Sequence, residues 1–195
     1  YLYNDKKYLD EGNHKKVVGL ILDFYAKAHM LKPSKEKQYL GDDPMLPLGA
    51  AGLERGLKGA LRTYQDGNKD YSQTILKSSL GYCFKCHTRT DFGPESLNWN
   101  LDIENYNITV IEKVELLVSM RSYEKALHML RNYLDWPGNM DRDNINKEKA
   151  LKYYLTLMVR VKKQPHEAYE VILRLSQNYE MPNSTLKTIE AWEKS

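Results

Sequence analysis

Two cysteines and a histidine stand close together in residues 80–88, LGYCFKCHT. Cys83 and Cys86 are the only cysteines of the chain, and His87 follows the second one directly. Residues three apart lie on one face of a helix, so the two thiols can reach two vinyl groups of one porphyrin and form thioethers. The histidine can then offer a ring nitrogen to the iron as its fifth ligand. The C-x-x-C-H spacing therefore predicts one covalent haem c, bound through Cys83, Cys86 and His87.

Three other interpretations of these residues stay open, together with a chance occurrence of the pattern. Structural zinc sites need four ligands, and the chain has no further cysteine to supply them. A thioredoxin-like dithiol needs a βαβ context, whereas the surrounding residues have helical periodicity. A disulfide between Cys83 and Cys86 would leave His87 unexplained. Haem attachment is the interpretation that accounts for all three residues.

Three helices are predicted to position this motif. The first follows Asn13 as its N-cap, and its apolar residues recur at three- and four-residue steps until Pro33 ends the pattern. The second spans residues 50–65, and the third spans residues 71–87 with Asp70 as its N-cap. The motif therefore lies at the C-terminal end of the third helix.

The other segments before residue 90 are less regular. Residues 32–48 contain two prolines and several turn formers, which predicts an irregular loop. Residues 1–12 predict either a fraying helical turn or an arm that contacts a partner. Gly52, Gly56 and Gly59 recur at helical spacing in the second helix. They indicate either a weak helix, since each costs about 1 kcal/mol relative to alanine, or a face against which a neighbouring helix or the porphyrin lies.

The second half of the chain has a different character, with helices in pairs. Helices are predicted over 104–121, 122–135, 147–163 and 165–179, with a linker at 91–103 and a capping helix at 183–194. Residues 122–130, SYEKALHML, are similar to the second helix of a tetratricopeptide repeat, and HEAY at 166–169 stands in the matching place. Two pairs are few for a free-standing solenoid, so this region is expected to dock on the haem region or on another protein. The predicted fold class is all-α, with a haem bundle at 1–98 and a tetratricopeptide-like region at 99–195.

Residues 10–90 resemble the c-type cytochromes through the C-x-x-C-H motif. They are also similar to the cytochrome c′ group, whose helical bundles carry this motif near the end of the last helix. The resemblance implies that His87 is the proximal iron ligand and that the haem is attached outside the cytoplasm, in the bacterial periplasm. The chain departs from that group in having three obvious helices, unless residues 1–11 supply a fourth.

The sixth position of the iron has several candidates. If the three helices run up, down and up, the ends of the first and third meet, which brings His29 or Met30 near the haem. A fourth, N-terminal helix would change this arrangement and make His14 the candidate. Met45 lies in a proline-rich loop, and the cytochrome resemblance makes thioether ligation from such a loop a further candidate. An open position is the remaining alternative, as the cytochrome c′ resemblance implies.

Composition excludes some classes of function. The chain has 195 residues, and 29 Lys and Arg against 26 Asp and Glu give a net charge of +3, too small to indicate binding to nucleic acid or to an anionic membrane surface. No apolar run approaches the roughly 18–20 residues of a membrane span. The sequence begins at Tyr1 with no visible signal peptide, so a leader or membrane anchor outside this numbering stays open.

Together these features predict an electron carrier rather than an enzyme. Two axial protein ligands favour outer-sphere electron transfer, and the helical repeats would hold the haem near redox protein partners in a larger extracytoplasmic complex. Lys77, Lys85 and Arg89 could form a cationic rim that steers acidic partners, or simply a solvated helix face. The alternatives are a haem-based binder or sensor of NO, CO or O₂ with an open axial site, and a scaffold or assembly subunit whose haem is structural.

Overall fold

The structure is a computed structural model of the chain and describes residues 1–31, 43–89, 103–135, 144–178 and 187. Every regular element in these residues is a helix, with no strand among them, so the predicted all-α class is confirmed. The chain forms two compact units, Tyr1–Ser122 and Tyr123–Ser195. Unit 1 contains the C-x-x-C-H motif.

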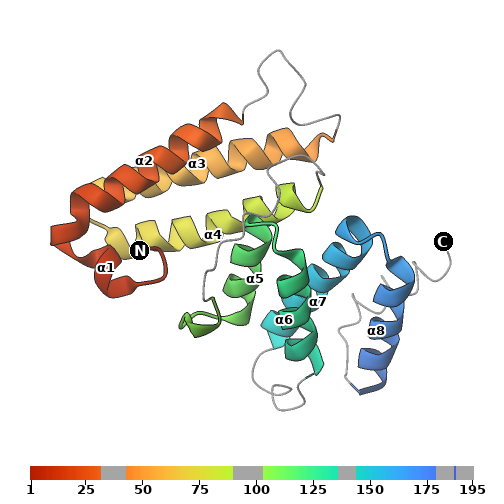
Figure 1. Cartoon of the computed structure of the whole chain (residues 1–195). Coiled ribbons are helices and arrows are strands. Elements are labelled where there is room, and N and C mark those ends of the chain that lie inside the picture. The colour runs from red at the N-terminus through yellow and green to blue at the C-terminus, as the bar shows by residue number, and fades with distance from the viewer. Residues whose placement is uncertain (32–42, 90–102, 136–143, 179–186, 188–195) are drawn as a thin grey trace. The chain divides into compact units, whose positions relative to one another are not determined.

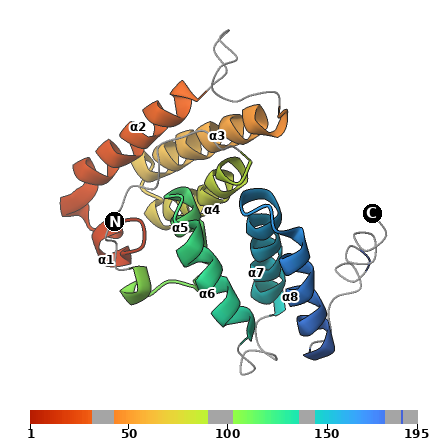
Figure 2. The same ribbon diagram turned by 45° about the vertical axis from the view of Figure 1, so that its right-hand side comes forward.

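Every regular element described in unit 1 is helical. Its elements are α1 (Asp5–Leu9), the 3-10 turn η1 (Glu11–Asn13), α2 (His14–Met30), α3 (Met45–Gln65), α4 (Lys69–His87), the 3-10 turn η2 (Ile103–Asn105) and α5 (Val110–Ser119). Helix α3 packs against both α2 and α4, and α5 packs against α4 (Figures 1 and 2). The chain reverses between α3 and α4 at Gly67, whose φ of +87° favours glycine.

Glycines set the distance between α3 and α4. A Cβ built on Gly52 would lie 2.4 Å from the ring of Tyr82, and one built on Gly56 would lie 2.5 Å from the hydroxyl of Ser79. Gly59 has no such neighbour within 4 Å. A neighbouring helix therefore lies against Gly52 and Gly56, as one of the two alternatives predicted, whereas Gly59 faces open space.

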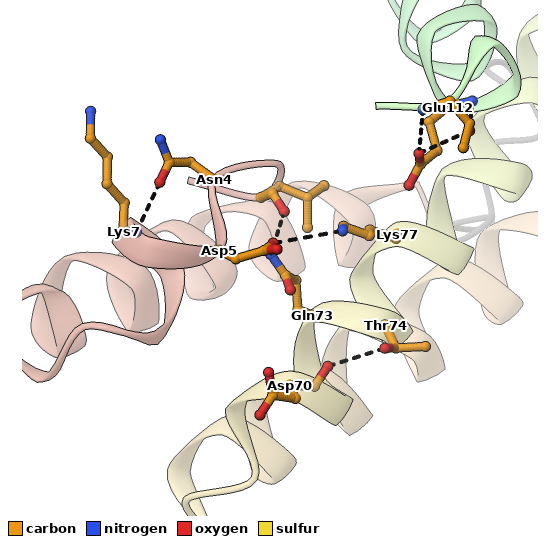
Figure 3. Close-up of polar contacts among 10 residues, drawn as sticks. Asn4, Asp5, Lys7, Asp70, Gln73, Thr74, Lys77 and Glu112 are labelled. Atoms are coloured by element: carbon orange, nitrogen blue, oxygen red, sulfur yellow. Dashed lines mark hydrogen bonds and ion pairs between the residues drawn. The ribbon is translucent and has the colours of Figure 1, made fainter. Parts of the chain in front are cut away.

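The N-terminal segment is fixed to the first half of α4. The side-chain amide of Gln73 donates hydrogen bonds to the carbonyl oxygen of Leu2 at 2.7 Å and to a carboxylate oxygen of Asp5 at 2.9 Å (Figure 3). Tyr8 is 1% exposed, and its hydroxyl lies 2.8 Å from that of Ser72. The predicted helical turn is therefore present as Asp5–Leu9 and is not frayed, because Tyr8 belongs to the core of unit 1. Contact of this segment with a partner stays a prediction.

Helix starts differ from the predictions at two places. Helix α3 begins at Met45 rather than at residue 50, and so includes Pro47 in its first turn. Proline is tolerated there because the first N–H groups of a helix have no intrahelical partner. Helix α4 is capped by the side chain of Asn68, and the predicted cap, Asp70, instead lies in the first turn, where its charge complements the helix dipole. Helix α2 begins directly after Asn13, as predicted.

Unit 2 contains the second half of the chain. Its described elements are α6 (Tyr123–Asp135), α7 (Asn144–Thr156), the π-helical turn η4 (Leu157–Val161) and α8 (Pro165–Asn178). Helix α7 packs against both α6 and α8. Tyr154 of α7 is fully buried, and its hydroxyl accepts a hydrogen bond from Arg131 Nε of α6 at 3.2 Å. Three of the predicted helices are therefore present here, in neighbouring antiparallel order.

The compact units divide the chain later than the predicted domains do. Helix α5 lies in unit 1 and α6 in unit 2, so the helices of the first predicted pair belong to different units. The predicted linker at 91–103, except Ile103, and the predicted capping helix at 183–194, except Lys187, lie outside the described residues. Within the described part of the chain, no helix is both long and apolar enough to cross a membrane.

Candidate functional site

The three motif residues occupy the last two turns of α4. Successive helix residues turn by about 100°, so Cys83, Cys86 and His87 fall within an arc of about 100°. Cys86 faces α3, whereas His87 faces α5. The helix ends at His87, and the hydroxyl of its C-cap residue, Thr88, donates to the carbonyl oxygen of Phe84 at 2.9 Å. The motif therefore lies on one side of α4, directed toward its two neighbouring helices, as the spacing predicts.

Cys86 lies directly against the backbone of α3. A Cβ built on Gly49 would lie 2.9 Å from the Cys86 sulfur, a distance at which no side chain fits without a shift. Burial raises the pKa of the Cys86 thiol, and the positive charge of Arg89 partly opposes this. Gly49 thus allows the Cys86 sulfur to lie against the backbone of α3, where a larger residue would clash with it.

Cys83 lies on the α5 side of the same arc. Burial raises the pKa of its thiol to about 11, and the charge of the Cys86 thiolate and the carboxylate of Glu115 on α5 act in the same direction. No disulfide joins it to Cys86. Both cysteines of the chain are therefore protonated thiols at neutral pH, held apart on two sides of one helix face.

His87 is held in a defined orientation by α5. Its Nδ1 lies 3.2 Å from the carbonyl oxygen of Val118. Because a carbonyl oxygen can only accept, Nδ1 carries the proton and Nε2 carries the lone pair. Burial lowers the pKa of the imidazole, and the hydrogen bond to Val118 partly offsets this. The ring is therefore neutral at pH 7, and its Nδ1 is directed at the backbone of α5.

Of the candidates for a second axial ligand, His29 is directed away from the motif. Its Nδ1 lies 2.8 Å from a carboxylate oxygen of Glu54 on α3. Glu54 is two residues from both Gly52 and Gly56, which places it about 160° around α3 from the face that contacts α4. The structure thus places α3 between His29 and the motif-bearing helix.

Met45 lies on the α4 side of α3. It precedes Gly49 by one turn, so both residues share the face that contacts Cys86. Asp43 ties this end of α3 to the end of α4, since its carboxylate accepts from the Met45 N–H at 2.9 Å and from Arg89 Nη1 at 2.7 Å. Met45 is 45% exposed. Among the predicted candidates, it is the one whose helix face adjoins the motif.

The other two candidates lie elsewhere in unit 1. Met30 ends α2 and is 82% exposed. His14 begins α2, and its ring lies 5.2 Å from the ring of Tyr64 near the end of α3. Since Tyr64 lies at the end of α3 opposite to Met45, His14 belongs to the end of the bundle remote from the motif.

The three cations of the predicted rim do not lie together around the motif. Arg89 is paired with Asp43 at 2.7 Å. Lys77 lies 4.0 Å from Asp5, and Lys85 is exposed on the side of α4 opposite to Cys83. Of the three cations, Arg89 is the one beside the end of the motif.

Two residues near the motif were not identified from the sequence. Gly49 continues the spacing of Gly52 and Gly56, and would have been found if α3 had been predicted to begin earlier. Val118 contributes only a backbone carbonyl, for which the residue type carries no signal. Such contacts depend on how distant segments pack.

Comparison with known proteins assigns neither a family nor a function to these residues. No protein-family model matches the chain, and neither curated proteins nor solved structures include a match. In the part of the chain that the structure describes, no group of three or more His, Cys, Asp or Glu side chains is arranged to hold a bare metal ion. Functional inference for this chain therefore depends on the chemistry of its own residues.

Proposed function

We propose that this chain is a monohaem c-type cytochrome that transfers electrons, with one haem c attached through Cys83 and Cys86. The observation that carries the proposal is the orientation of His87 on the same helix face as the two thiols. Histidines that bind a metal commonly donate their second ring N–H to a carbonyl or carboxylate, which fixes the ring and its tautomer. The contact between His87 Nδ1 and Val118 is of this kind.

The residues around the motif fit a covalent porphyrin chemically. Cys83 and Cys86 are thiols, the form needed to make two thioethers, and no disulfide joins them. The absence of a side chain at Gly49 lets the Cys86 sulfur lie directly against the backbone of α3.

The haem iron would supply a one-electron couple, and the protein residues would set its environment. His87 is the proximal ligand in this proposal, and Met45 is the favoured second ligand because it lies on the α4 side of α3. His29 is less suited because it contacts Glu54 on the other side. A methionine ligand raises the reduction potential relative to histidine. We therefore expect a six-coordinate centre of relatively high potential, acting as an electron carrier and not as an enzyme.

Unit 2 is proposed to hold the haem near its redox partners. Its antiparallel helices α6, α7 and α8 are of the kind that the tetratricopeptide resemblance implies. Such helical hairpins usually present a surface to a neighbouring unit or to another protein. We propose that the protein works as a subunit or docked partner of a larger extracytoplasmic, periplasmic redox complex.

The reaction of the reduced haem protein with CO tests this proposal. If Met45 fills the second axial position, the absorption spectrum of the reduced protein should not change on addition of CO. A Met45→Ala variant should bind CO and have a lower reduction potential. His29→Gln is the matched control, and its spectrum and CO response should be those of the unaltered protein. An iron without a reversible couple would contradict electron transfer.

A gas-binding function is the second candidate. The exposure of Met45, at 45%, favours it, because an unpacked side chain is not held at a fixed position. In this case the reduced, unaltered protein should bind CO directly. Met45→Ala would then leave CO binding unchanged.

A further inference from the structure

The start of α3 meets the end of α4 at two places. Two residues before α3, the carboxylate of Asp43 accepts a hydrogen bond from Arg89 Nη1, two residues after α4, at 2.7 Å. One turn inside α3, Gly49 lies against Cys86, since a Cβ built on this glycine would be 2.9 Å from the sulfur. Met45 stands between these two contacts in the sequence. The turn that carries Met45 is therefore held to the motif-bearing helix on both sides.

Asp43 fixes the backbone at the start of α3 as well as the ion pair. One carboxylate oxygen accepts from the Met45 N–H at 2.9 Å, and the other accepts from Arg89. Its carbonyl oxygen accepts from the N–H of Leu46 at 3.1 Å. Asp side chains commonly stabilise turns through such bonds to the backbone two residues on. A single residue thus joins the backbone of Met45 to the end of α4.

Arg89 is in turn fixed to the motif. Its backbone N–H donates to the carbonyl oxygen of Cys86 at 3.0 Å. The preceding residue, Thr88, bonds to the carbonyl oxygen of Phe84 through its N–H at 3.1 Å and through its hydroxyl at 2.9 Å. The guanidinium therefore extends from an ordered helix end. A continuous series of bonds leads from Cys86 through Arg89 and Asp43 to Met45.

The ion pair between Asp43 and Arg89 is half-buried. Their side chains are 30% and 24% exposed, so solvent screens their charges less than it does at the open surface. The pair of Lys27 with Asp23 is different, because both belong to α2 and their side chains are 69% and 61% exposed. Exposed pairs of that kind contribute little to structure. A charge-assisted bond between two helices, by contrast, can fix their separation.

We infer that Asp43 and Arg89 are positioning residues, which hold Met45 beside the motif as a ligand of the haem iron. This inference rests on the proposed function, in which Met45 is the second axial ligand. Neither positioning residue contacts the iron, and each acts through Met45. It also explains how a side chain that is 45% exposed can keep its place, since its backbone is held by bonds on both sides. Arg89 thereby has a role other than the steering of acidic partners.

The test measures the reduction potential and the CO response of the haem-loaded full chain. Asp43→Asn removes the ion pair, but its amide oxygen can still accept from the Met45 N–H. Arg89→Gln removes the pair from the other side. Both variants should have a lower potential, and their reduced forms should bind CO, because a less firmly held methionine leaves the iron more readily. The double variant should differ little from the single ones, since all three lose the same contact.

A direct effect of charge predicts a different pattern. Removing the anion of Asp43 near the iron would raise the potential, whereas removing the cation of Arg89 would lower it. A decrease in both variants therefore distinguishes positioning from charge. Asp23→Asn is the matched control, because it makes the same substitution in an exposed ion pair within one helix. It should change neither the potential nor the CO response.

The ion pair can also be tested in the full chain produced without haem. Asp43→Asn and Arg89→Gln should each lower the unfolding temperature, and the double variant should lower it no further than the single ones. Asp23→Asn should leave it unchanged. Additive effects of the two substitutions would show that the side chains do not act as a pair, and would contradict the inference.

Other outcomes separate this inference from the proposed function. If Asp43→Asn and Arg89→Gln shift the potential in opposite directions or not at all, and neither binds CO, the positioning role is contradicted. A Met45→Ala variant that does bind CO would then show that the proposed function stands. If Met45→Ala changes neither the potential nor the CO response, Met45 is not a ligand and the positioning role is contradicted with it. A full chain that never acquires a haem would contradict both proposals.

Discussion

The two halves of α4 differ in how their buried polar groups are satisfied. In the first half, Ser72 donates to the carbonyl oxygen of Ala60 at 2.7 Å and also meets the Tyr8 hydroxyl. The amide of Gln73 has two acceptors in the N-terminal segment. In the second half, the buried hydroxyl of Ser79 donates to the carbonyl oxygen of Ile75 at 2.8 Å, within the same helix. The motif contributes two half-buried thiols and the imidazole of His87, which contacts Val118 of α5.

This difference indicates two tasks for one helix. The first half joins the N-terminal segment, α3 and α4 into one core through hydrogen bonds between these segments, and so contributes to stability. The second half places Cys83, Cys86 and His87 on a single face. The predictions that follow test this contrast.

The largest expected effect is on the reactivity of Cys83. Because burial raises the pKa of its thiol to about 11, the thiolate fraction at pH 8 should be about 100-fold lower in the folded, haem-free chain than in the unfolded chain. Alkylation by iodoacetamide, followed by mass spectrometry, should be slower by at least this factor. Cys86 should react faster than Cys83, since Arg89 opposes the rise of its pKa. Equal rates in the folded and unfolded chains would contradict the buried site.

The next effect concerns the close contact between α3 and α4. Gly52→Ala should lower the free energy of unfolding by about 1–3 kcal/mol, because the new Cβ would overlap the Tyr82 ring. Gly59→Ala is the control on the same helix, and should raise the free energy of unfolding by up to about 1 kcal/mol. Urea denaturation of both variants measures the difference. Stabilisation by both substitutions would show that the helices are not this close.

A similar but smaller loss is expected in the first half of α4. Ser72→Ala removes the partner of the buried Tyr8 hydroxyl and should lower the free energy of unfolding by about 1–2 kcal/mol. Ser78→Ala, at an exposed position of the same helix, should change it by less than about 0.5 kcal/mol. If both variants unfold alike, the hydrogen bonds of the first half do not distinguish it from the second.

The smallest effect is the pH dependence that His87 gives to the haem-free chain. Burial lowers the pKa of His87 in the folded state, so the unfolded chain binds a proton more readily. Stability should therefore fall as the pH decreases below the ordinary histidine pKa of about 6.5. His87→Gln should make the unfolding free energy depend less on pH between about 7 and 5, as measured by urea denaturation at several pH values. An unchanged pH dependence would contradict a buried, neutral His87.

Local patterns in the sequence predicted much of unit 1. Helix α2 after Asn13, the course of α4 and the common face of Cys83, Cys86 and His87 all follow from residue spacing within a single helix. The start of α3 was missed because Pro47 resembles a loop residue, although the first turn of a helix accepts proline. Propensity alone does not distinguish these two uses.

Contacts between distant segments could not be predicted in this way. His29 was a candidate ligand because of its place near the end of a helix, yet its orientation is set by Glu54 on another helix. The role of Val118 likewise arises from the packing of α5 against α4. Periodicity identifies the face of a helix, but tertiary packing decides what that face meets.

The mass of the intact protein, produced in cells that attach c-type haems, tests the central claim most directly. The account predicts a chain heavier by one haem, and no such addition in a variant carrying both Cys83→Ala and Cys86→Ala. A bare polypeptide mass for the unaltered chain, with both thiols available to alkylation after unfolding, would contradict it.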